Sequence, residues 1–319
     1  MTMGKSILEE LITLPTNYSD QDLWSTVGNT PLIRLQRLTE DIPESVEIYG
    51  KAEWLNPGGS VKDRPAAAIL STALSNGLLE EGRVFLDSTS GNMGIAYATL
   101  GAALGIRVHI VIPSNAGPER LTILRALGAE LIETDPLEGS EGARVVAAEM
   151  AAKNPDRYYY ANQYSNPANW QAHYLTTGPE IASQTHGRIT HFVAGLGTTG
   201  TMMGTGRYLK EAHPDVVLVA VEPEGPMHGL EGLKHLPTSD VPQIYDPTLP
   251  DETVRVKTEE AYDMVRRLGK EEGLFVGISA GAAVAAAYKH AKQIESGVIV
   301  VLLPDSGMKY LNQPVWSPQ

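Results

Sequence analysis

The sequence contains no cysteine, and this absence excludes several kinds of chemistry at once. Disulfides, thiolate zinc sites and cysteine nucleophiles all require a thiol group. Any covalent catalysis must therefore use another side chain. The eight histidines show no metal-ligand spacing, so the sequence also predicts no catalytic metal.

Positive charge and long apolar runs are also scarce. The chain has 25 basic and 38 acidic residues, and the resulting formal charge of -13 argues against a nucleic-acid-binding surface. No run approaches the ~20 apolar residues that a membrane helix needs, and the N-terminus lacks the plan of a secretory signal. We therefore expect a cytoplasmic protein without nucleic-acid or membrane partners. Small anionic substrates stay open, because a local cluster of donors can outweigh the global charge.

The pattern along the chain predicts an α/β protein. With 319 residues, of which 42% are hydrophobic, the chain is long enough for a large core and two domains. Apolar β-rich runs alternate with alanine-rich helical runs, which implies parallel strand pairing and ligands at the carboxyl ends of strands. The expected strands are residues 47–52, 84–86, 107–112, 130–133, 158–160, 191–194, 216–221 and 298–303. The expected helices are residues 64–75, 94–104, 118–127, 139–153, 169–184, 201–212, 258–273 and 281–294. Residues 223–253 are too irregular for a regular element and are expected to form a lid or an active-site loop.

A lysine follows a glycine-rich turn in the run Asn56-Pro57-Gly58-Gly59-Ser60-Val61-Lys62-Asp63-Arg64. The residues before the turn indicate a strand, and those after it indicate the start of a helix. The two glycines let the backbone approach a ligand, and a partly desolvated lysine can act as a nucleophile toward an aldehyde. Lys62 is therefore a candidate for Schiff-base chemistry. Taken alone, it could equally be a solvated lysine at a helix N-terminus.

The turn Ser88-Thr89-Ser90-Gly91-Asn92-Met93-Gly94 joins another predicted strand to a helix. Hydroxyls, an amide and the free N–H groups of a helix N-terminus converge there, which is typical of a carboxylate or phosphate site. A simple N-cap would explain one of these hydroxyls but not all of them.

Two further turns lie in equivalent places. The amides and three threonine hydroxyls of Gly195-Leu196-Gly197-Thr198-Thr199-Gly200-Thr201 could surround a phosphate. This turn also matches G-x-G-x-x-G, with Glu222 about 20 residues further on, so an NAD-dependent dehydrogenase that uses Gly195, Gly197 and Gly200 is an alternative. That alternative leaves the lysine run and the first turn unexplained. In the last turn, Gly277-Ile278-Ser279-Ala280-Gly281, Ser279 could cap a helix or hydrogen-bond a ligand nitrogen.

Together, these segments resemble the fold-type-II family of enzymes that use pyridoxal 5′-phosphate, and within it the cysteine synthases. The resemblance covers nearly the whole chain, in motifs that follow the family's order. These motifs are residues 27–32, 56–64, 89–94, 162–169, 176–180, 197–201 and 277–281. Residues 191–207 and 226–237 are most similar to the B-type enzymes, which are O-acetylserine sulfhydrylases.

The resemblance implies a fold, a cofactor and a cofactor site. The fold would be two doubly wound α/β domains of the tryptophan-synthase-β-like type. The smaller, mobile N-terminal domain would be residues 40–160, and the larger domain would combine residues 1–39 and 161–319. Pyridoxal 5′-phosphate would be bound covalently by Lys62, which would later remove the α-proton of the substrate. Asn92 would hydrogen-bond the phenolic oxygen of the cofactor, and Ser279 would face its ring nitrogen. Its phosphate would be held by Gly197, Thr198, Thr199, Gly200 and Thr201.

The resemblance also implies the reaction. Thr89, Ser90, Gly91 and Gln163 would bind the substrate carboxylate and trigger closure of the smaller domain. An activated L-serine would lose its leaving group to give an α-aminoacrylate, and sulfide would add to release L-cysteine. The family is usually homodimeric. A cystathionine β-synthase-like replacement and a non-catalytic binding protein on the same fold are the remaining alternatives.

One position departs from the family motif, and another bears on which activated serine is the substrate. Met93 replaces the usual threonine of Thr-Ser-Gly-Asn-Thr-Gly, so the carboxylate loop lacks a hydroxyl and an apolar side chain is expected to intrude. Enzymes that prefer O-phosphoserine have an arginine where this chain has Glu224. A carboxylate would repel a dianionic phosphate, so O-acetylserine is the expected donor. O-phosphoserine stays possible if Arg120, Lys234 or His228 supplies the positive charge.

Overall fold

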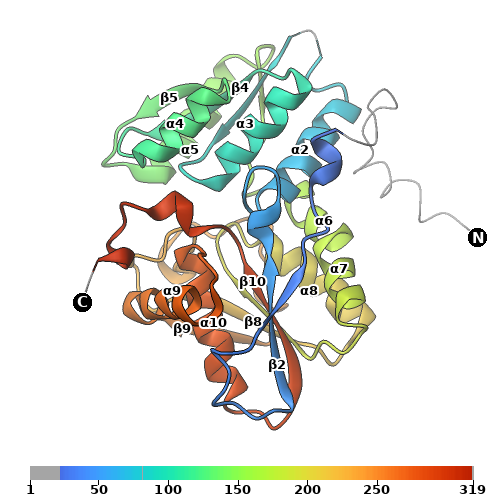
Figure 1. Ribbon diagram of the computed structural model, residues 1–319. Coiled ribbons are helices and arrows are strands. Elements are labelled where there is room, and N and C mark those ends of the chain that lie inside the picture. Colours follow the sequence, from blue (N-terminus) through green and yellow to red (C-terminus); the bar gives the residue numbers. More distant parts are fainter. Residues whose placement is uncertain (1–21, 81, 318–319) are drawn as a thin grey trace, which may run out of the picture. The chain divides into compact units, whose positions relative to one another are not determined.

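The computed structural model describes residues 22–80 and 82–317 of the chain, which divides into two compact units (Figure 1). The first unit contains the described residues up to Val27 and Asn56–Ala172, and the second contains Gly28–Leu55 and the residues from His173 onward. Relative to the predicted division, residues 22–27 and 161–172 group with the first unit and residues 40–55 with the second. Domain mobility stays a prediction.

The first unit is built on a four-stranded parallel sheet of order β5-β4-β3-β6. Alternate residues of a strand face opposite sides of a sheet. Phe85 of β3 therefore packs in an apolar cluster with α2, α3 and α4, while Val84 and Leu86 pack in a second cluster with α5. The strands are β3 Val84–Ser88, β4 Val108–Pro113, β5 Glu130–Thr134 and β6 Tyr158–Tyr160. The helices are α2 Asp63–Ser75, α3 Asn92–Leu104, α4 Pro118–Ala126 and α5 Gly139–Lys153.

The second unit is built on a six-stranded sheet of order β1-β2-β10-β7-β8-β9. Its core lies where Val193, Val219 and Ile299 pack with residues of α9 and α10. The strands are β1 Leu32–Leu35, β2 Val46–Ala52, β7 His191–Gly195, β8 Val217–Pro223, β9 Glu252–Val256 and β10 Gly297–Leu303. The helices are α7 Thr177–Gln184, α8 Gly200–Ala212, α9 Thr258–Glu272 and α10 Ile278–Ala291, and α6 Ala168–Leu175 spans the boundary between the units. The short 3₁₀ segments of the chain are Trp24–Thr26, Glu53–Leu55, Leu236–Thr238, Gly307–Tyr310 and Pro314–Trp316.

The predicted α/β class is confirmed, but three details of the prediction were wrong. Strands β1 and β9 were missed, and β1 pairs antiparallel with β2, although the sequence implied only parallel pairing. Both lie at sheet edges, where most of their side chains are at least partly exposed, so their hydrophobic signal is weak. The helix expected over residues 169–184 is two helices, because Thr176 has the non-helical angles φ -124° and ψ -67°.

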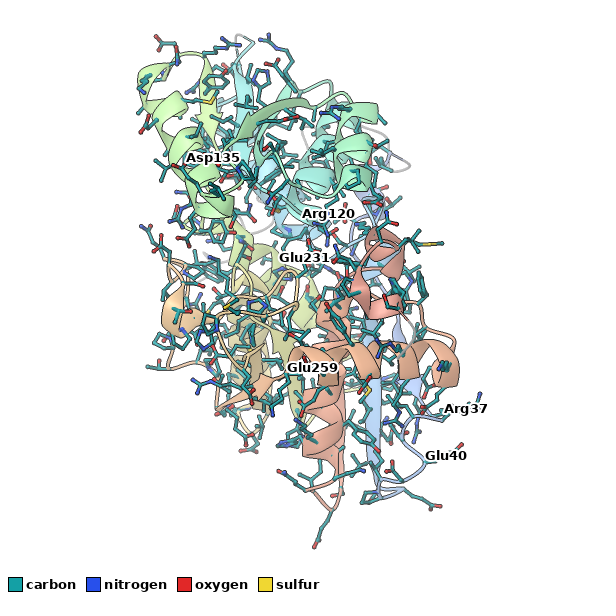
Figure 2. All side chains as sticks on the ribbon, turned by 90° about the vertical axis from the view of Figure 1, so that its left-hand side faces the viewer. Arg37, Glu40, Arg120, Asp135, Glu231 and Glu259 are labelled. Carbon is teal, nitrogen blue, oxygen red and sulfur yellow. The ribbon has the colours of Figure 1, made fainter. Side chains whose placement is uncertain are left out.

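The surface of the described chain carries many charged side chains. Arg37, Glu40 and Glu259 are exposed on the second unit (Figure 2). Across residues 22–80 and 82–317, no helix is long and apolar enough to cross a membrane. Residues 224–251 contain one 3₁₀ turn and no other regular element, as expected for an irregular segment. A role of this segment as a lid stays a prediction.

Candidate active site

Lys62 lies at the start of α2 in the first unit, where it is the N-cap residue. The buried carboxylate of Asp63 shapes the turn before it by accepting the N–H groups of Gly58 at 2.8 Å and Ser60 at 3.1 Å. A Cβ atom at Gly58 would lie 2.3 Å from Asp63 Oδ1, so a larger residue there would displace this carboxylate from its hydrogen bonds. The Lys62 side chain is half-buried. The turn therefore delivers a lysine to a strand-to-helix junction, as the sequence predicted.

The carboxylate loop, residues 88–94, follows β3 in the same unit. Thr89 continues the sheet by donating its N–H to Val111 O at 3.1 Å, and its hydroxyl oxygen accepts the Gly91 N–H at 3.2 Å. Gly91 is the N-cap of α3, and no side chain caps the helix. Nη1 of the buried Arg120 donates to Ser90 O at 3.2 Å. The loop therefore combines helix N-terminal N–H groups with half-buried hydroxyls, an arrangement that can bind a carboxylate.

Gln163 lies beside this loop although it is far away in the sequence. Its side chain is buried, and Nε2 donates to Ser88 O at 3.1 Å. Asn169 Nδ2 donates to the Gln163 carbonyl at 2.8 Å and fixes the backbone. The structure thus brings together the residues expected to bind the substrate carboxylate, namely Thr89, Ser90, Gly91 and Gln163, next to Asn92 at the start of α3.

The expectation for Met93 was wrong in one respect. Its side chain is 2% exposed and packs in the apolar cluster of the first unit. The residue follows Asn92 in α3, and its side chain belongs to the core rather than to the ligand-binding side of the loop. The missing hydroxyl remains a departure from the family pattern, but the methionine does not intrude.

The phosphate turn, residues 195–201, precedes α8 in the second unit. Thr199 is the N-cap residue, and its positive φ of 69° is unusual for a residue other than glycine. A Cβ atom at Gly197 would lie 2.4 Å from the carbonyl oxygen of Gly232, so only glycine fits. Within the described residues, the buried Thr199 Oγ1 has no hydrogen-bond partner. A buried polar atom normally has one, so this hydroxyl indicates a ligand at the helix N-terminus.

His173 lies behind the phosphate turn and was missed by the sequence analysis. It is 1% exposed, and its Nε2 lies 3.3 Å from Thr201 Oγ1 while its Nδ1 lies 2.9 Å from Thr177 Oγ1. If Nδ1 accepts from Thr177, then Nε2–H donates to Thr201 and leaves the Thr201 O–H for a ligand. The only sequence signal was that Thr177 lies in one of the family motifs.

Ser279 is the second residue of α10 and is 6% exposed. The N-cap of α10 is Gly277, so Ser279 does not cap the helix. A buried hydroxyl at a helix start remains available to a ligand nitrogen, which was the other function considered for it. Ser279 and the phosphate turn belong to the second unit, whereas Lys62 and the carboxylate loop belong to the first.

The dehydrogenase alternative requires a carboxylate at Glu222 that can reach a ribose. Glu222 is 3% exposed, and Arg255 Nε donates to its Oε1 at 2.9 Å. The carboxylate therefore already binds a cation from the neighbouring strand. This pairing argues against a nicotinamide site.

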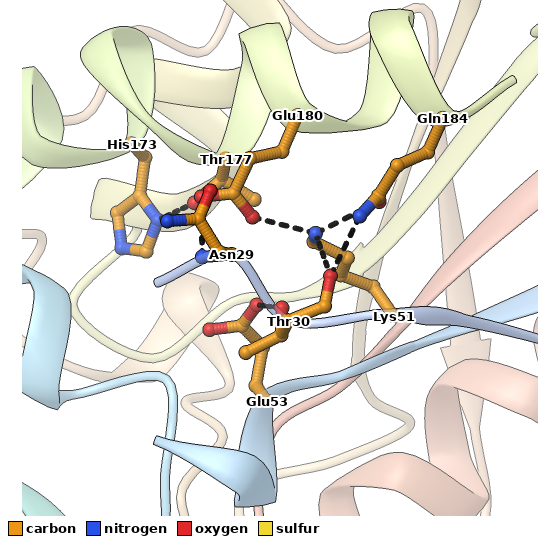
Figure 3. A network of polar contacts seen from close by, with 8 residues as sticks. All are labelled: Asn29, Thr30, Lys51, Glu53, His173, Thr177, Glu180 and Gln184. Carbon is orange, nitrogen blue, oxygen red and sulfur yellow. Dashed lines mark hydrogen bonds and ion pairs between the residues drawn. The ribbon is translucent and has the colours of Figure 1, made fainter. Parts of the chain in front are cut away.

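Lys51, which is fully buried, has a different role from the half-buried Lys62 (Figure 3). Lys51 of β2 is 0% exposed, and its Nζ donates to Thr30 O at 2.6 Å, Glu180 Oε2 at 2.6 Å and Gln184 Oε1 at 3.0 Å. The same Glu180 accepts the Asn29 N–H at 2.9 Å. This network ties residues 29–30 and β2 to α7, so Lys51 is a structural cation. Among the residues that the structure describes, no three His, Asp or Glu side chains are grouped so that they could hold a metal ion.

Comparisons with known proteins agree with this geometry. Residues 23–305 match the family model described as pyridoxal-phosphate dependent enzyme. The chain is 51% identical over 308 residues to a cysteine synthase of Aquifex aeolicus (strain VF5), covering 95% of this chain and 94% of the relative. It is 41% identical over 297 residues to cysteine synthase B of Escherichia coli (strain K12), covering 93% and 96%.

A solved structure is similar over the same length. The crystal structure of cysteine synthase (OASS) from Entamoeba histolytica has a TM-score of 0.90 and 36% identity, covering 96% of this chain and 94% of that one. Sequence and fold therefore agree over nearly the full chain. The protein belongs to the family of pyridoxal-phosphate-dependent enzymes, among its cysteine synthases.

Proposed function

We propose that this protein is a cysteine synthase that uses pyridoxal 5′-phosphate to replace the β-substituent of an activated L-serine by sulfide. The observation that carries the proposal is the phosphate turn, where Thr199 has a strained backbone and a buried hydroxyl without a partner in the described chain. The turn fits a phosphate ester, because helix N–H groups and hydroxyls bind phosphate well. The near-full-length relatives named cysteine synthases support the reaction.

Each unit offers residues of the types that the parts of the cofactor require. Gly197, Thr198, Thr199, Gly200 and Thr201 would hold its phosphate, Lys62 would bind it covalently, Asn92 would hydrogen-bond its phenolic oxygen, and Ser279 would face its ring nitrogen. When bound, the cofactor withdraws electrons from the α-carbon of the substrate. A neutral hydroxyl at Ser279 leaves the ring nitrogen unprotonated, whereas an aspartate would keep it cationic.

The first unit supplies the residues that handle the substrate. The N–H groups and hydroxyls of Thr89, Ser90 and Gly91, with the Gln163 amide, would hold the substrate carboxylate and fix the orientation of the α-carbon. The Lys62 amine, once released by the incoming substrate, would remove the α-proton as a general base. The leaving group would then depart from the β-carbon, HS⁻ would add there, and the Lys62 ammonium would return the proton to the α-carbon.

The test is whether the purified protein forms L-cysteine from O-acetylserine and sulfide. A yellow protein that makes cysteine supports the proposal. A colourless protein that binds a nicotinamide would favour a dehydrogenase, and a yellow protein that reacts with no activated serine would favour a non-catalytic binding protein. Use of homocysteine in place of sulfide would favour a cystathionine β-synthase-like reaction. The proposal includes a homodimer and a cytoplasmic location, which sedimentation and cell fractionation can check.

Substitution of His173 is expected to weaken cofactor binding without stopping the reaction. His173→Ala removes the group that orients Thr201, and a hydrogen bond of this kind contributes about 1 kcal/mol. The dissociation constant of pyridoxal 5′-phosphate, measured by equilibrium dialysis, should rise roughly five- to tenfold. His213→Ala, at the other end of α8, is the matched control. Equal losses in the two variants would show that His173 does not support the phosphate turn.

The donor substrate is proposed to be O-acetylserine. Glu224 follows β8, its side chain is 58% exposed, and its nearest cation in the described chain is Lys257 at 3.9 Å. A surface pair at that distance leaves most of the negative charge in place, so a phosphorylated donor is disfavoured. Glu224→Arg should shift the ratio of reaction rates toward O-phosphoserine by about tenfold, since a charge-assisted contact contributes about 1.5 kcal/mol or more. Rates with both donors at matched concentration provide the measurement. A wild-type preference for O-phosphoserine would refute the assignment, and no shift in the variant would mean that Glu224 does not meet the leaving group.

A further inference from the structure

Asp87 is a buried carboxyl next to the carboxylate loop that the proposed reaction does not use. It is the penultimate residue of β3 and is 1% exposed. Its Oδ1 accepts the Ser88 N–H at 2.9 Å, and the Ser88 carbonyl accepts Gln163 Nε2 at 3.1 Å. The backbone of one residue, Ser88, therefore connects Asp87 with a side chain that is expected to bind the substrate carboxylate.

The other carboxyl oxygen of Asp87 has no partner in the described chain, although a phenol lies near the carboxyl. Asp87 Oδ2 and the Tyr97 hydroxyl are both buried, and neither has a hydrogen-bond partner within residues 22–80 and 82–317. Tyr97 of α3 is nevertheless close enough to lower the pKa of Asp87, as are the N–H groups of Ser88 and Gln163, but burial outweighs them and raises that pKa to about 7. None of the groups that shift the Asp87 pKa is a cation.

The remaining groups around Asp87 stay in one charge state near neutral pH. Burial raises the pKa values of Tyr97, Tyr159 of β6 and Tyr160 of β6, and it raises that of Tyr164 to about 12. These four phenols are therefore neutral. Arg144 of α5 acts on Tyr160 and Tyr164, and Glu141 of α5 acts on Tyr164. The buried Arg120, whose guanidinium stays charged, contacts the loop at Ser90 O. Asp87 is thus the group of this cluster whose charge changes between pH 6 and 8.

A substrate carboxylate in the loop would lie close to Asp87 in space. Thr89, the first residue expected to bind the carboxylate, lies two residues after Asp87, and at about 3.3 Å per residue the ligand lies on the order of 10 Å away. At about 10 Å and an effective dielectric constant of about 20, an ionised Asp87 repels a bound carboxylate. This repulsion lowers the affinity for the carboxylate by a factor on the order of ten. A proton on Oδ2 would remove this repulsion and could be donated to the Tyr97 oxygen, while Oδ1 still accepts from Ser88.

We propose that Asp87 is a proton-linked positioning residue, whose side chain fixes the Ser88 peptide and takes up a proton when the loop receives a substrate carboxylate. The inference rests on the proposed function, because it requires this loop to bind the substrate. By linkage, the anion and the proton strengthen each other's binding by the same factor. Donor affinity is then highest below the pKa of the free Asp87 and falls as the pH rises through it.

Calorimetry of the cofactor-loaded enzyme with L-serine, which lacks a good leaving group, tests this linkage. Titrations at pH 8 in two buffers of different ionisation enthalpy give the number of protons taken up on binding. The wild type should take up roughly half a proton more than Asp87→Asn, because a tenfold coupling moves the Asp87 pKa upward by about one unit. Protons exchanged by the serine amino group are common to both proteins and cancel. Asp135→Asn, an exposed aspartate of the same unit (Figure 2), should match the wild type. Equal uptake in wild type and Asp87→Asn would overturn the proposal.

Two further variants separate this proposal from its premise. Tyr97→Phe removes a hydroxyl that lowers the pKa of Asp87, so the pH at which L-serine affinity falls should move upward. An unchanged pH profile would contradict the role of Asp87. This test does not require that Asp87→Asn folds. A structural defect alone would weaken binding equally at pH 6 and pH 9.

Gln163→Ala tests the premise that this loop binds the substrate carboxylate. If L-serine binds to this variant as tightly as to the wild type, both the proposed function of the loop and the inference are refuted.

Discussion

Lys62→Ala is expected to abolish the visible absorption of the purified protein and to lower kcat by about a thousandfold or more. The lysine both binds the cofactor covalently and acts as the general base, and removal of a general base alone costs about a hundred- to ten-thousandfold. Absorption spectra and cysteine formation from O-acetylserine provide the two measurements. A variant that keeps the colour and turns over normally would show that Lys62 is only a helix N-terminal residue.

Two other lysines serve as controls for this experiment. Lys153→Ala removes a lysine whose side chain is 72% exposed, and it should leave colour and turnover unchanged. Lys51→Met should instead destabilise the fold by about 3–5 kcal/mol, because it leaves Glu180 without its buried partner. The expected contrast is loss of chemistry at Lys62 and loss of stability at Lys51. If Lys51→Met folds properly and loses its colour, the covalent link to the cofactor has been assigned to the wrong lysine.

Gly197→Ala is expected to lower cofactor affinity by about 10- to 100-fold. The added methyl group would meet the Gly232 carbonyl at 2.4 Å, and a backbone atom cannot rotate away from the contact. Overpacking of this kind costs about 1–3 kcal/mol, and here the phosphate turn would have to move to relieve it. Equilibrium dialysis gives the cofactor dissociation constant, and thermal unfolding of the cofactor-free protein shows whether the fold survives.

The matched control is Gly269→Ala in α9, where an added Cβ would meet no atom within 4 Å. Alanine is the better helix former by about 1 kcal/mol, so this variant should be slightly more stable and bind the cofactor normally. If Gly197→Ala binds pyridoxal 5′-phosphate as tightly as the control does, the phosphate does not lie in this turn.

Much of the fold could be predicted from the sequence, because most strands are buried on both faces and read as continuous apolar runs. Strand β6 and helix α5 begin and end at the predicted residues. The edge strands β1 and β9 were missed because exposure removes the apolar run, and Arg34 and Arg255 interrupt what remains. The break at Thr176 was missed because no glycine stands there, and the proline that follows lies inside the next helix.

The candidate site was predictable where one segment of the chain contains the whole feature. The turns at Lys62, Thr89 and Gly197 each join a strand to a helix, and local pattern alone identifies them. His173 and Asp87 were missed because their significance depends on residues from other segments of the chain. These residues are Thr201 for His173 and Gln163 for Asp87. A single histidine or aspartate carries no such information in a sequence read without its fold.

The pairing of β2 with β10 has a consequence for how the chain reaches its native state. Val46, early in the chain, pairs with Gly297, about 250 residues later, so this ladder of the larger sheet joins segments that are synthesised far apart in time. Such distant pairings carry a high loop-closure entropy and slow folding, whereas β3 to β6 come from one continuous stretch. On the ribosome, the four-stranded sheet can therefore form first, while β2 waits with an unpaired edge until residues 297–303 emerge. During that interval the unpaired edge of β2 is open to wrong partners, and a chaperone that shields it would raise the yield of folded protein.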